Sequence, residues 1–230
     1  MKNSTGLTIF GWLVTLVIPF VLLFTSMRLL LTPAFINLEY RMPGFPEDPH
    51  GITFEQRLKY TPIMLEYLLN DQGPSFLADK TFDDSSPLLN EREVGHMKDV
   101  KDLTKIVLNI WLVLLAFLVV VDLAALRFKW WDRFRAWLVR GAQLTIGLIV
   151  TILIFVALSF NALFTGFHRI FFTGDTWLFS YSDTLIRLFP IRFWQDVFIA
   201  LGVLTLLGAG LIWWGFSKKG MKVKKAKAEK

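Results

Sequence analysis

The stretch IVLNIWLVLLAFLVVVDLAAL, residues 106–126, decides the fold class. Its only charged side chain is Asp122, and a transmembrane helix needs about 20 mainly apolar residues. Residues 106–126 are therefore predicted to cross a membrane as a helix. Three further stretches meet the same criterion, at residues 7–31, 142–165 and 191–214. With 54% hydrophobic residues in the whole chain, the sequence predicts an all-α membrane protein of four spans.

Residues 7–31 also resemble a signal peptide, which is the alternative to a retained span. Their apolar stretch is longer than the roughly 7–15 residues of a signal-peptide core, and no small-x-small cleavage site follows it. We therefore expect a retained helix, with a kink at Pro19.

The basic residues predict how the spans are oriented. The link at residues 127–141 carries five basic residues against Asp132 alone, and the tail beyond residue 216 is rich in lysine. Residues 33–103 instead hold 13 acids and 7 bases. Because cytoplasmic loops are enriched in Lys and Arg, both termini and the link are predicted to be cytoplasmic. Residues 33–103 and 166–190 are predicted to face outside. The tail favours membrane lipid headgroups as its partner, and no nucleic acid.

The outer region at residues 33–103 is predicted to be a small cap of helix and loop, with one short strand at residues 35–40. Thr53 is a candidate N-cap for a helix over residues 54–70. Asn90 and Glu93 have the spacing of a capping box, with Asn as the capping residue.

No helix breaker lies between this box and Ile106, so we expect one continuous helix into the second span. This helix would place His96 about 15 Å above Ile106. Asp99 follows at i+3 on the same helix face.

The second outer segment, residues 166–190, is short and aromatic. Asn161, Phe164 and His168 share a helix face if the third span continues through them. Ser182 is expected to cap a short interfacial helix before Pro190. Aromatic belts at membrane surfaces are usually rich in Trp and Tyr. This segment is mainly Phe, which suits a dry cavity for acyl chains.

The three histidines are the main candidates for chemistry, because the chain has no cysteine. His96 and His168 each lie at a membrane boundary, where a folded cap would bring them together; the alternative is that each is an ordinary interfacial residue. His50, in a Pro-rich loop, is expected to be a surface residue. We find neither the HExxH motif of zinc proteases nor the GxSxG motif of serine hydrolases, so no metal site is predicted.

Charges within the spans give no support for transport. Arg28 and Asp196 lie near the outer ends of the first and fourth spans, where they either pair or reach the interface separately. No charge lies near a bilayer midplane, which disfavours an ion or solute pathway.

Several motifs together resemble the lipoprotein intramolecular transacylase family. They are EYRMPG (39–44), DPHGIT (48–53), VGHMKDVKDL (94–103), NALFTGFHRIFFTGDTWLF (161–179) and DTLIRLFP (183–190) with FW (193–194). The resemblance implies four spans with an extracytoplasmic cap. It also implies transfer of the sn-2 acyl chain from the S-glyceryl group of a diacyl lipoprotein to the α-amino group of its N-terminal cysteine. The product is a lyso-form lipoprotein.

By motif, the catalytic pair of the family corresponds to His96 and His168, with no cofactor. From their positions we assign supporting roles to Arg41, Asn161 and Tyr40 as oxyanion donors, to Asp99 as a partner of His96, and to Glu39 as a partner of Arg41. The predicted substrate pocket comprises Phe164, Phe167, Phe171, Phe172 and Trp177. The alternative function is a non-catalytic scaffold that binds lipoproteins without altering them.

The predicted segments are as follows: spans at 1–32, 104–126, 142–165 and 191–216, the cap at 33–103, the cytoplasmic loop at 127–141, the aromatic outer loop at 166–190 and the basic tail at 217–230.

Overall fold

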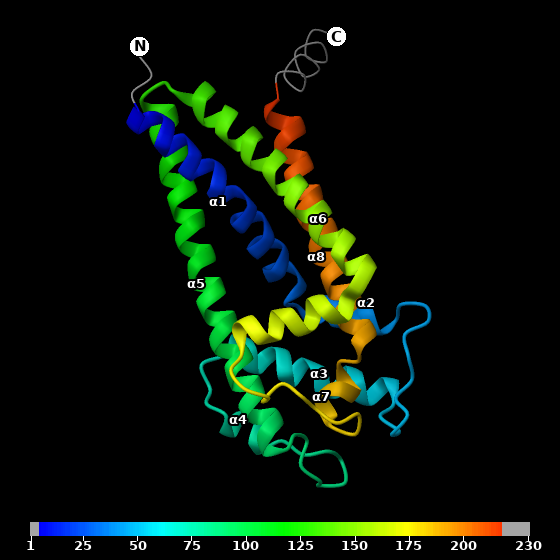
Figure 1. Cartoon of the computed structure of the whole chain (residues 1–230). Coiled ribbons are helices and arrows are strands. Elements are labelled where there is room, and N and C mark those ends of the chain that lie inside the picture. Colours follow the sequence, from blue (N-terminus) through cyan, green and yellow to red (C-terminus); the bar gives the residue numbers. More distant parts are fainter. Residues whose placement is uncertain (1–4, 218–230) are drawn as a thin grey trace, which may run out of the picture. The chain divides into compact units, whose positions relative to one another are not determined.

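The computed structural model describes residues 5–217, and every regular element in that part of the chain is a helix (Figure 1). The helices are α1 (Thr5–Leu30), α2 (Pro33–Tyr40), α3 (Phe54–Leu69), α4 (Ser75–Ala78), α5 (Glu91–Arg127), α6 (Trp131–Phe171), α7 (Thr184–Leu188) and α8 (Ile191–Phe216). Four of them, α1, α5, α6 and α8, are long and apolar enough to cross a membrane. The predicted fold class is confirmed. The basic tail, apart from its first residue, lies outside the described residues.

The short strand predicted at residues 35–40 is wrong, because this stretch is helix α2. The Thr32 hydroxyl accepts a hydrogen bond from the Phe35 backbone N–H, and Pro33 opens the first turn. Proline suits that position since its fixed φ is already helical and its missing N–H would have no partner there. Within residues 5–217, β pairing is limited to one isolated bridge between Thr81 and Pro87.

Two predicted helix starts are confirmed by their hydrogen bonds. Thr53 and Gln56 form a reciprocal capping box at the start of α3. At the start of α5, the Asn90 side chain accepts from the Glu93 N–H, and the Glu93 carboxylate accepts from the Asn90 N–H. As predicted, α5 then continues without interruption to Arg127. Each box satisfies backbone donors that a helix N-terminus leaves unpaired.

Helix α6 is bent, which the sequence does not predict. Ser159 has φ −159° and ψ 75°, so two helical pieces meet there although no proline is present. Asn161, Phe164 and His168 all follow the bend, and they therefore lie on one helical piece.

The predicted cap at Ser182 is displaced by one residue. Helix α7 begins at Thr184 with Asp183 at the capping position, but the Asp183 side chain makes no capping bond. Its carboxylate binds other partners instead, as described below.

The chain divides into two compact units. Of the described residues, the first comprises 5–27, 109–154 and 200–217, and its core packs the side chains Val14, Ile18, Val121, Ala125, Phe134, Trp137 and Leu138. A Cβ on Gly141 would lie only 2.6 Å from Ile18, so glycine allows α1 and α6 to approach closely. Polar groups in this unit are paired within it: the Trp111 indole donates to Thr25, and Thr205 donates to Ser26.

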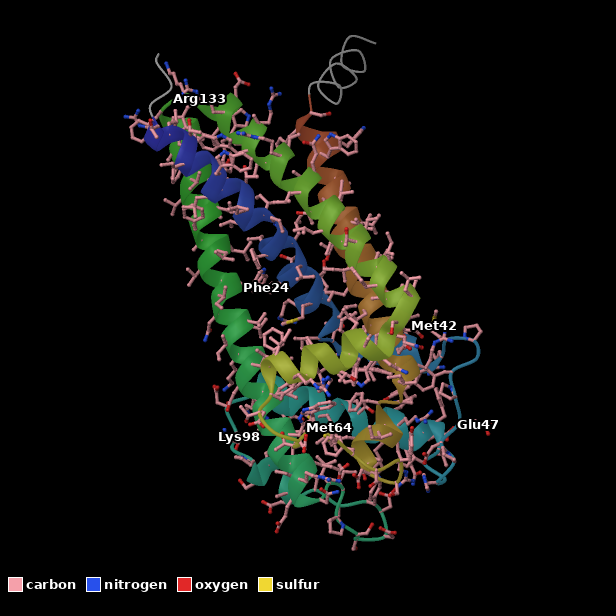
Figure 2. All side chains as sticks on the ribbon, viewed as in Figure 1. Phe24, Met42, Glu47, Met64, Lys98 and Arg133 are labelled. Atoms are coloured by element: carbon pink, nitrogen blue, oxygen red, sulfur yellow. The ribbon has the colours of Figure 1, made fainter. Side chains whose placement is uncertain are left out.

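The second unit comprises residues 28–108 and 155–199. Its main core packs α3, the start of α5 and α7 around Tyr60, Met64, Tyr67, Leu88 and Leu188. Met64 is only 1% exposed, and Figure 2 shows its position on α3. Both candidate histidines belong to this unit.

Candidate active site

The structure brings His96 and His168 together, although they are far apart in the sequence. His96 lies in the second turn of α5, and His168 lies in the last turn of α6. Their ring centroids are 6.1 Å apart, and the ring planes are inclined by 21°. Each residue is only 8% exposed. Two imidazoles at this separation can act on the two ends of one small reacting group.

Aromatic rings enclose the pair. Phe172 contacts both imidazoles, at centroid distances of 5.0 Å from His96 and 5.4 Å from His168. His168 is also flanked by Phe164 at 4.2 Å, Trp177 at 4.9 Å and Phe167 at 5.6 Å. Of the predicted pocket residues, Phe171 is more distant: it is 50% exposed and packs on Phe167. The walls of the site are therefore apolar.

One hydrogen bond defines the protonation of His168. Its Nδ1 lies 2.8 Å from the Phe164 carbonyl oxygen. Because a carbonyl oxygen only accepts, Nδ1 carries the proton, and the neutral ring has its lone pair on Nε2. His168 therefore presents a proton acceptor at a fixed atom.

His96 differs from His168 because its Nδ1 is buried and has no hydrogen-bond partner among the described residues. Both histidines lie outside the apolar stretches of their helices. Burial, reinforced by the proximity of His168, lowers the pKa of His96 to about 4. Burial also lowers the pKa of His168, and the bond to the Phe164 carbonyl opposes that shift. Both imidazoles are therefore neutral at pH 7.

Three predicted supporting residues have other partners. The Arg41 guanidinium donates to Asn37 rather than to Glu39, so the predicted Glu39–Arg41 pair is wrong. Glu39 is buried against Asp196, and burial together with that carboxyl raises the pKa of Glu39. The hydroxyl of Tyr40 contacts Thr61 and donates to the carbonyl oxygen of Leu188, each at 2.7 Å.

A pair between Arg28 and Asp196 does not form either. Asp196 pairs with Arg192 one turn earlier in α8, and Arg28 donates to the Leu31 carbonyl.

Asp99 and Asn161 make no hydrogen bond to either imidazole in the described part of the chain. Asn161 is exposed, and Asp99 is half-buried. Asp99 lines a cavity of about 240 Å³ together with Phe171 and Phe172. Asp99 therefore borders the wall that Phe172 shares with both histidines.

Three residues of the site were not predicted. The Phe179 ring centroid lies 5.3 Å from that of His96, and the Arg92 guanidinium lies 5.4 Å above the centroid of the Phe179 ring. Arg92 also binds Asp183 at 3.0 Å. Phe179 belongs to the aromatic cluster that the sequence reveals, whereas nothing in the sequence connects Arg92 with Asp183, 91 positions away.

Within residues 5–217, no group of three or more His, Asp or Glu side chains is placed to hold a metal ion.

Comparisons with known proteins agree with this architecture. The protein-family model described as "Lipoprotein intramolecular transacylase Lit" matches residues 12–194. An uncharacterized protein of Aquifex aeolicus (strain VF5) is 29% identical over 202 residues, which cover 85% of this chain and 87% of that protein.

Two solved structures share the fold. The membrane integral lipoprotein intramolecular transacylase Lit from Bacillus cereus has a TM-score of 0.73 and 19% identity, covering 94% of this chain and 98% of that chain. A variant of the same protein with one histidine-to-arginine mutation has a TM-score of 0.68 and 19% identity, with 98% of each chain covered.

Proposed function

The chain belongs to the lipoprotein intramolecular transacylase family, and we propose that it converts diacyl lipoproteins into the lyso form by His-pair catalysis. The sn-2 acyl chain of the S-glyceryl group is transferred to the α-amino group of the N-terminal cysteine. As a member of this family the protein is a multi-pass membrane acyltransferase, which decides against a non-catalytic scaffold. Its partners are the diacyl lipoprotein and membrane lipids, with no nucleic acid.

The reaction requires proton transfers at two places. The amine attacks the ester carbonyl and loses a proton, and the departing glyceryl oxygen gains one. Counting from the amine nitrogen to the carbonyl carbon, the attack closes an eight-membered ring. An α-amino group has a pKa of about 7.7–8.0 and is mostly protonated at pH 7. Overall, an ammonium and an ester become an amide, an alcohol and one released proton.

His168 is the proposed base. Its Nε2 lone pair is free because Nδ1–H is committed to the Phe164 carbonyl. Nε2 takes the proton from the attacking nitrogen, and the fixed Nδ1–H bond orients the ring for that step.

His96 is the proposed acid. It donates an N–H proton to the departing glyceryl oxygen and regains one from the His168 imidazolium at its second nitrogen. Because burial lowers its pKa to about 4, His96 stays neutral between turnovers. A neutral imidazole has one N–H that can donate a proton and one nitrogen that can accept one.

The aromatic walls orient the reacting ends of the substrate and keep water away from the ester. An eight-membered ring closes poorly in solution, and holding the two reacting ends together is worth up to about 7–11 kcal/mol. Phe164, Phe167 and Phe172 also exclude water, which would otherwise hydrolyse the ester. Arg41 and Asn161 stay candidates for oxyanion stabilisation, and Asp99 stays a candidate for orienting His96.

The sidedness of the site follows from charge. We propose that both termini face the cytoplasm and that the histidine pair lies at the extracytoplasmic membrane surface, because the basic link at residues 127–141 and the acidic cap have opposite charge.

The observation that carries this proposal is the enclosed pair of imidazoles, 6.1 Å apart. We expect His96→Ala and His168→Ala each to lower N-acylation by about 100- to 10,000-fold, since each removes one proton-transfer group. The matched control is His50→Ala, because His50 is exposed in a loop. Each purified variant is incubated with a diacyl lipopeptide, with and without a chelator.

Mass fragmentation must locate the acyl chain, because the transfer conserves total mass. N-acylated lyso product from either His96→Ala or His168→Ala at the wild-type rate would remove that histidine from the mechanism. Loss of activity with the chelator would contradict the metal-free chemistry.

A further inference from the structure

The histidine pair is closed to a lipid-sized substrate in this structure. Each imidazole-bearing residue is 8% exposed, and the cavity beside Phe172 measures about 240 Å³. Pockets for small ligands usually measure about 300–1,000 Å³. A larger hollow of about 820 Å³ is lined by Ala78, by residues 87–91 and 93–95 at and before the start of α5, and by residues 182–184, with neither histidine among its lining residues. A substrate with two acyl chains therefore requires part of the site to move.

Residues 173–183 are the segment that can uncover the pair. They connect α6 to α7 without regular helix, and they supply Trp177 against His168 and Phe179 against His96. Gly174 has φ +65°, a conformation that glycine adopts without strain, at the beginning of this segment. Leu178 and Tyr181 are 48% and 86% exposed. The segment thus contacts the site with alternate aromatic side chains while its other face is open.

Polar contacts hold the far end of the segment to α5. The Asp183 carboxylate accepts from Arg92 at 3.0 Å, from the Asn90 side chain at 3.3 Å and from the Ser180 backbone N–H at 2.8 Å. The Arg92 guanidinium also covers the Phe179 ring. One ion pair therefore connects the end of the segment to the ring that packs on His96.

We propose that residues 173–183 form a lid over the histidine pair, and that Arg92 and Asp183 form the latch that holds it closed. The proposal rests on the proposed function, because the need for opening comes from the size of the substrate. The Arg92 side chain is 49% exposed whereas the Asp183 side chain is 15% exposed, so water reaches one partner of the ion pair and the latch can open. Closure behind the bound headgroup returns Trp177 and Phe179 to the site and excludes water.

A reversible crosslink across the latch tests the lid. The chain has no cysteine, so Arg92→Cys with Asp183→Cys introduces the only two thiols. Joining them with a short bis-methanethiosulfonate should lower turnover at least tenfold, and reduction should restore it. The matched control is Lys59→Cys with Asp83→Cys, which replaces another ion pair of the same unit that touches neither histidine. The same reagent should leave that control unchanged.

A second measurement does not depend on the double variant or on turnover. Diethyl pyrocarbonate should modify His96 and His168 several-fold faster in Arg92→Ala than in Lys59→Ala, as mass spectrometry of peptides reads directly. Full turnover by the crosslinked protein would contradict the proposed lid. Equal rates of histidine modification in Arg92→Ala and Lys59→Ala would contradict it as well. Absence of N-acylated product from the wild-type protein would instead contradict the proposed function. The modification rates would still test whether residues 173–183 cover the histidine pair.

Discussion

At the scale of single residues, burial matters more than any charged neighbour for the histidine pair. His168 is held by a backbone carbonyl rather than by a carboxylate, and His96 has no hydrogen bond at Nδ1. A carboxylate partner would raise the pKa of an imidazole and favour its charged form. Within the described residues neither imidazole has a carboxylate partner, so both rings stay neutral. Neutral rings can accept a proton from an ammonium group, which charged rings cannot.

The low pKa of His96 predicts how stability depends on pH. In the unfolded chain a histidine has a pKa of about 6.5, whereas burial lowers that of His96 to about 4. Between these values the unfolded chain binds a proton that the native chain does not. The free energy of unfolding should therefore fall as pH falls from 6.5 to 4, by about 3 kcal/mol over the whole window.

The test compares the wild-type protein with His96→Gln in detergent, by unfolding midpoints at pH 7 and pH 4.5. Glu39 acts in the opposite sense, since its raised pKa makes stability fall as pH rises above the ordinary carboxyl range. That contribution is common to both proteins and cancels in the difference. Equal midpoint shifts in the two proteins would show that His96 titrates normally.

What the sequence reveals at this scale depends on the distance between partners. Positions of His96 and His168 at membrane boundaries follow from helix rise and the ends of apolar runs. The partners of Glu39 and Tyr40 cannot be predicted in this way, because Asp196 and Leu188 belong to segments about 150 residues away. The prediction paired Glu39 with Arg41 because the two are close in the sequence, but the Arg41 side chain donates to Asn37 instead.

At the scale of elements, local rules succeed where a helix start satisfies its own donors. The capping boxes at Thr53 and Asn90 are complete within four residues, and both were predictable. The start of α7 was not, because its capping residue Asp183 is drawn to Arg92 on α5. The bend at Ser159 likewise lacks a sequence signal, since neither proline nor glycine is adjacent to it.

The aromatic lid predicts a change of product when one ring is removed. Phe179 is half-buried and contacts His96, so Phe179→Ala should admit water to the ester. We expect free fatty acid to rise at least fivefold relative to the N-acylated product, because hydrolysis then competes with transfer. Thin-layer chromatography of a radiolabelled lipopeptide separates the two products.

The matched control is Phe82→Ala, because Phe82 and Phe179 are partly buried against the same hydrophobic core. Both changes should cost about 1–2 kcal/mol of stability. Only Phe179→Ala should alter the product ratio. An equal rise of fatty acid in Phe82→Ala would attribute hydrolysis to general loosening of the core.

At the scale of the whole molecule, the apolar spans and the polar segments that connect them have different roles. The spans satisfy their backbone polar groups internally, as a membrane requires. The histidine pair belongs to the unit of residues 28–108 and 155–199, which has its own core. The composition and spacing of apolar runs are enough to predict this division. The contacts that close the site arise only when residues 173–183 meet α5.

Orientation is the remaining property of the whole molecule that charge predicts, and the cysteine-free chain makes it measurable. Gly73→Cys lies in the cap, where an added Cβ meets no other atom, and Ala136→Cys lies in an exposed position of the basic link. A membrane-impermeant maleimide added to intact cells should label Gly73→Cys and leave Ala136→Cys unlabelled. Permeabilised cells are the control, since both thiols should then react. Labelling of Ala136→Cys in intact cells would place the basic link outside and the histidine pair on the cytoplasmic face. The proposed site would then have no access to exported lipoproteins, and the proposed orientation would be wrong.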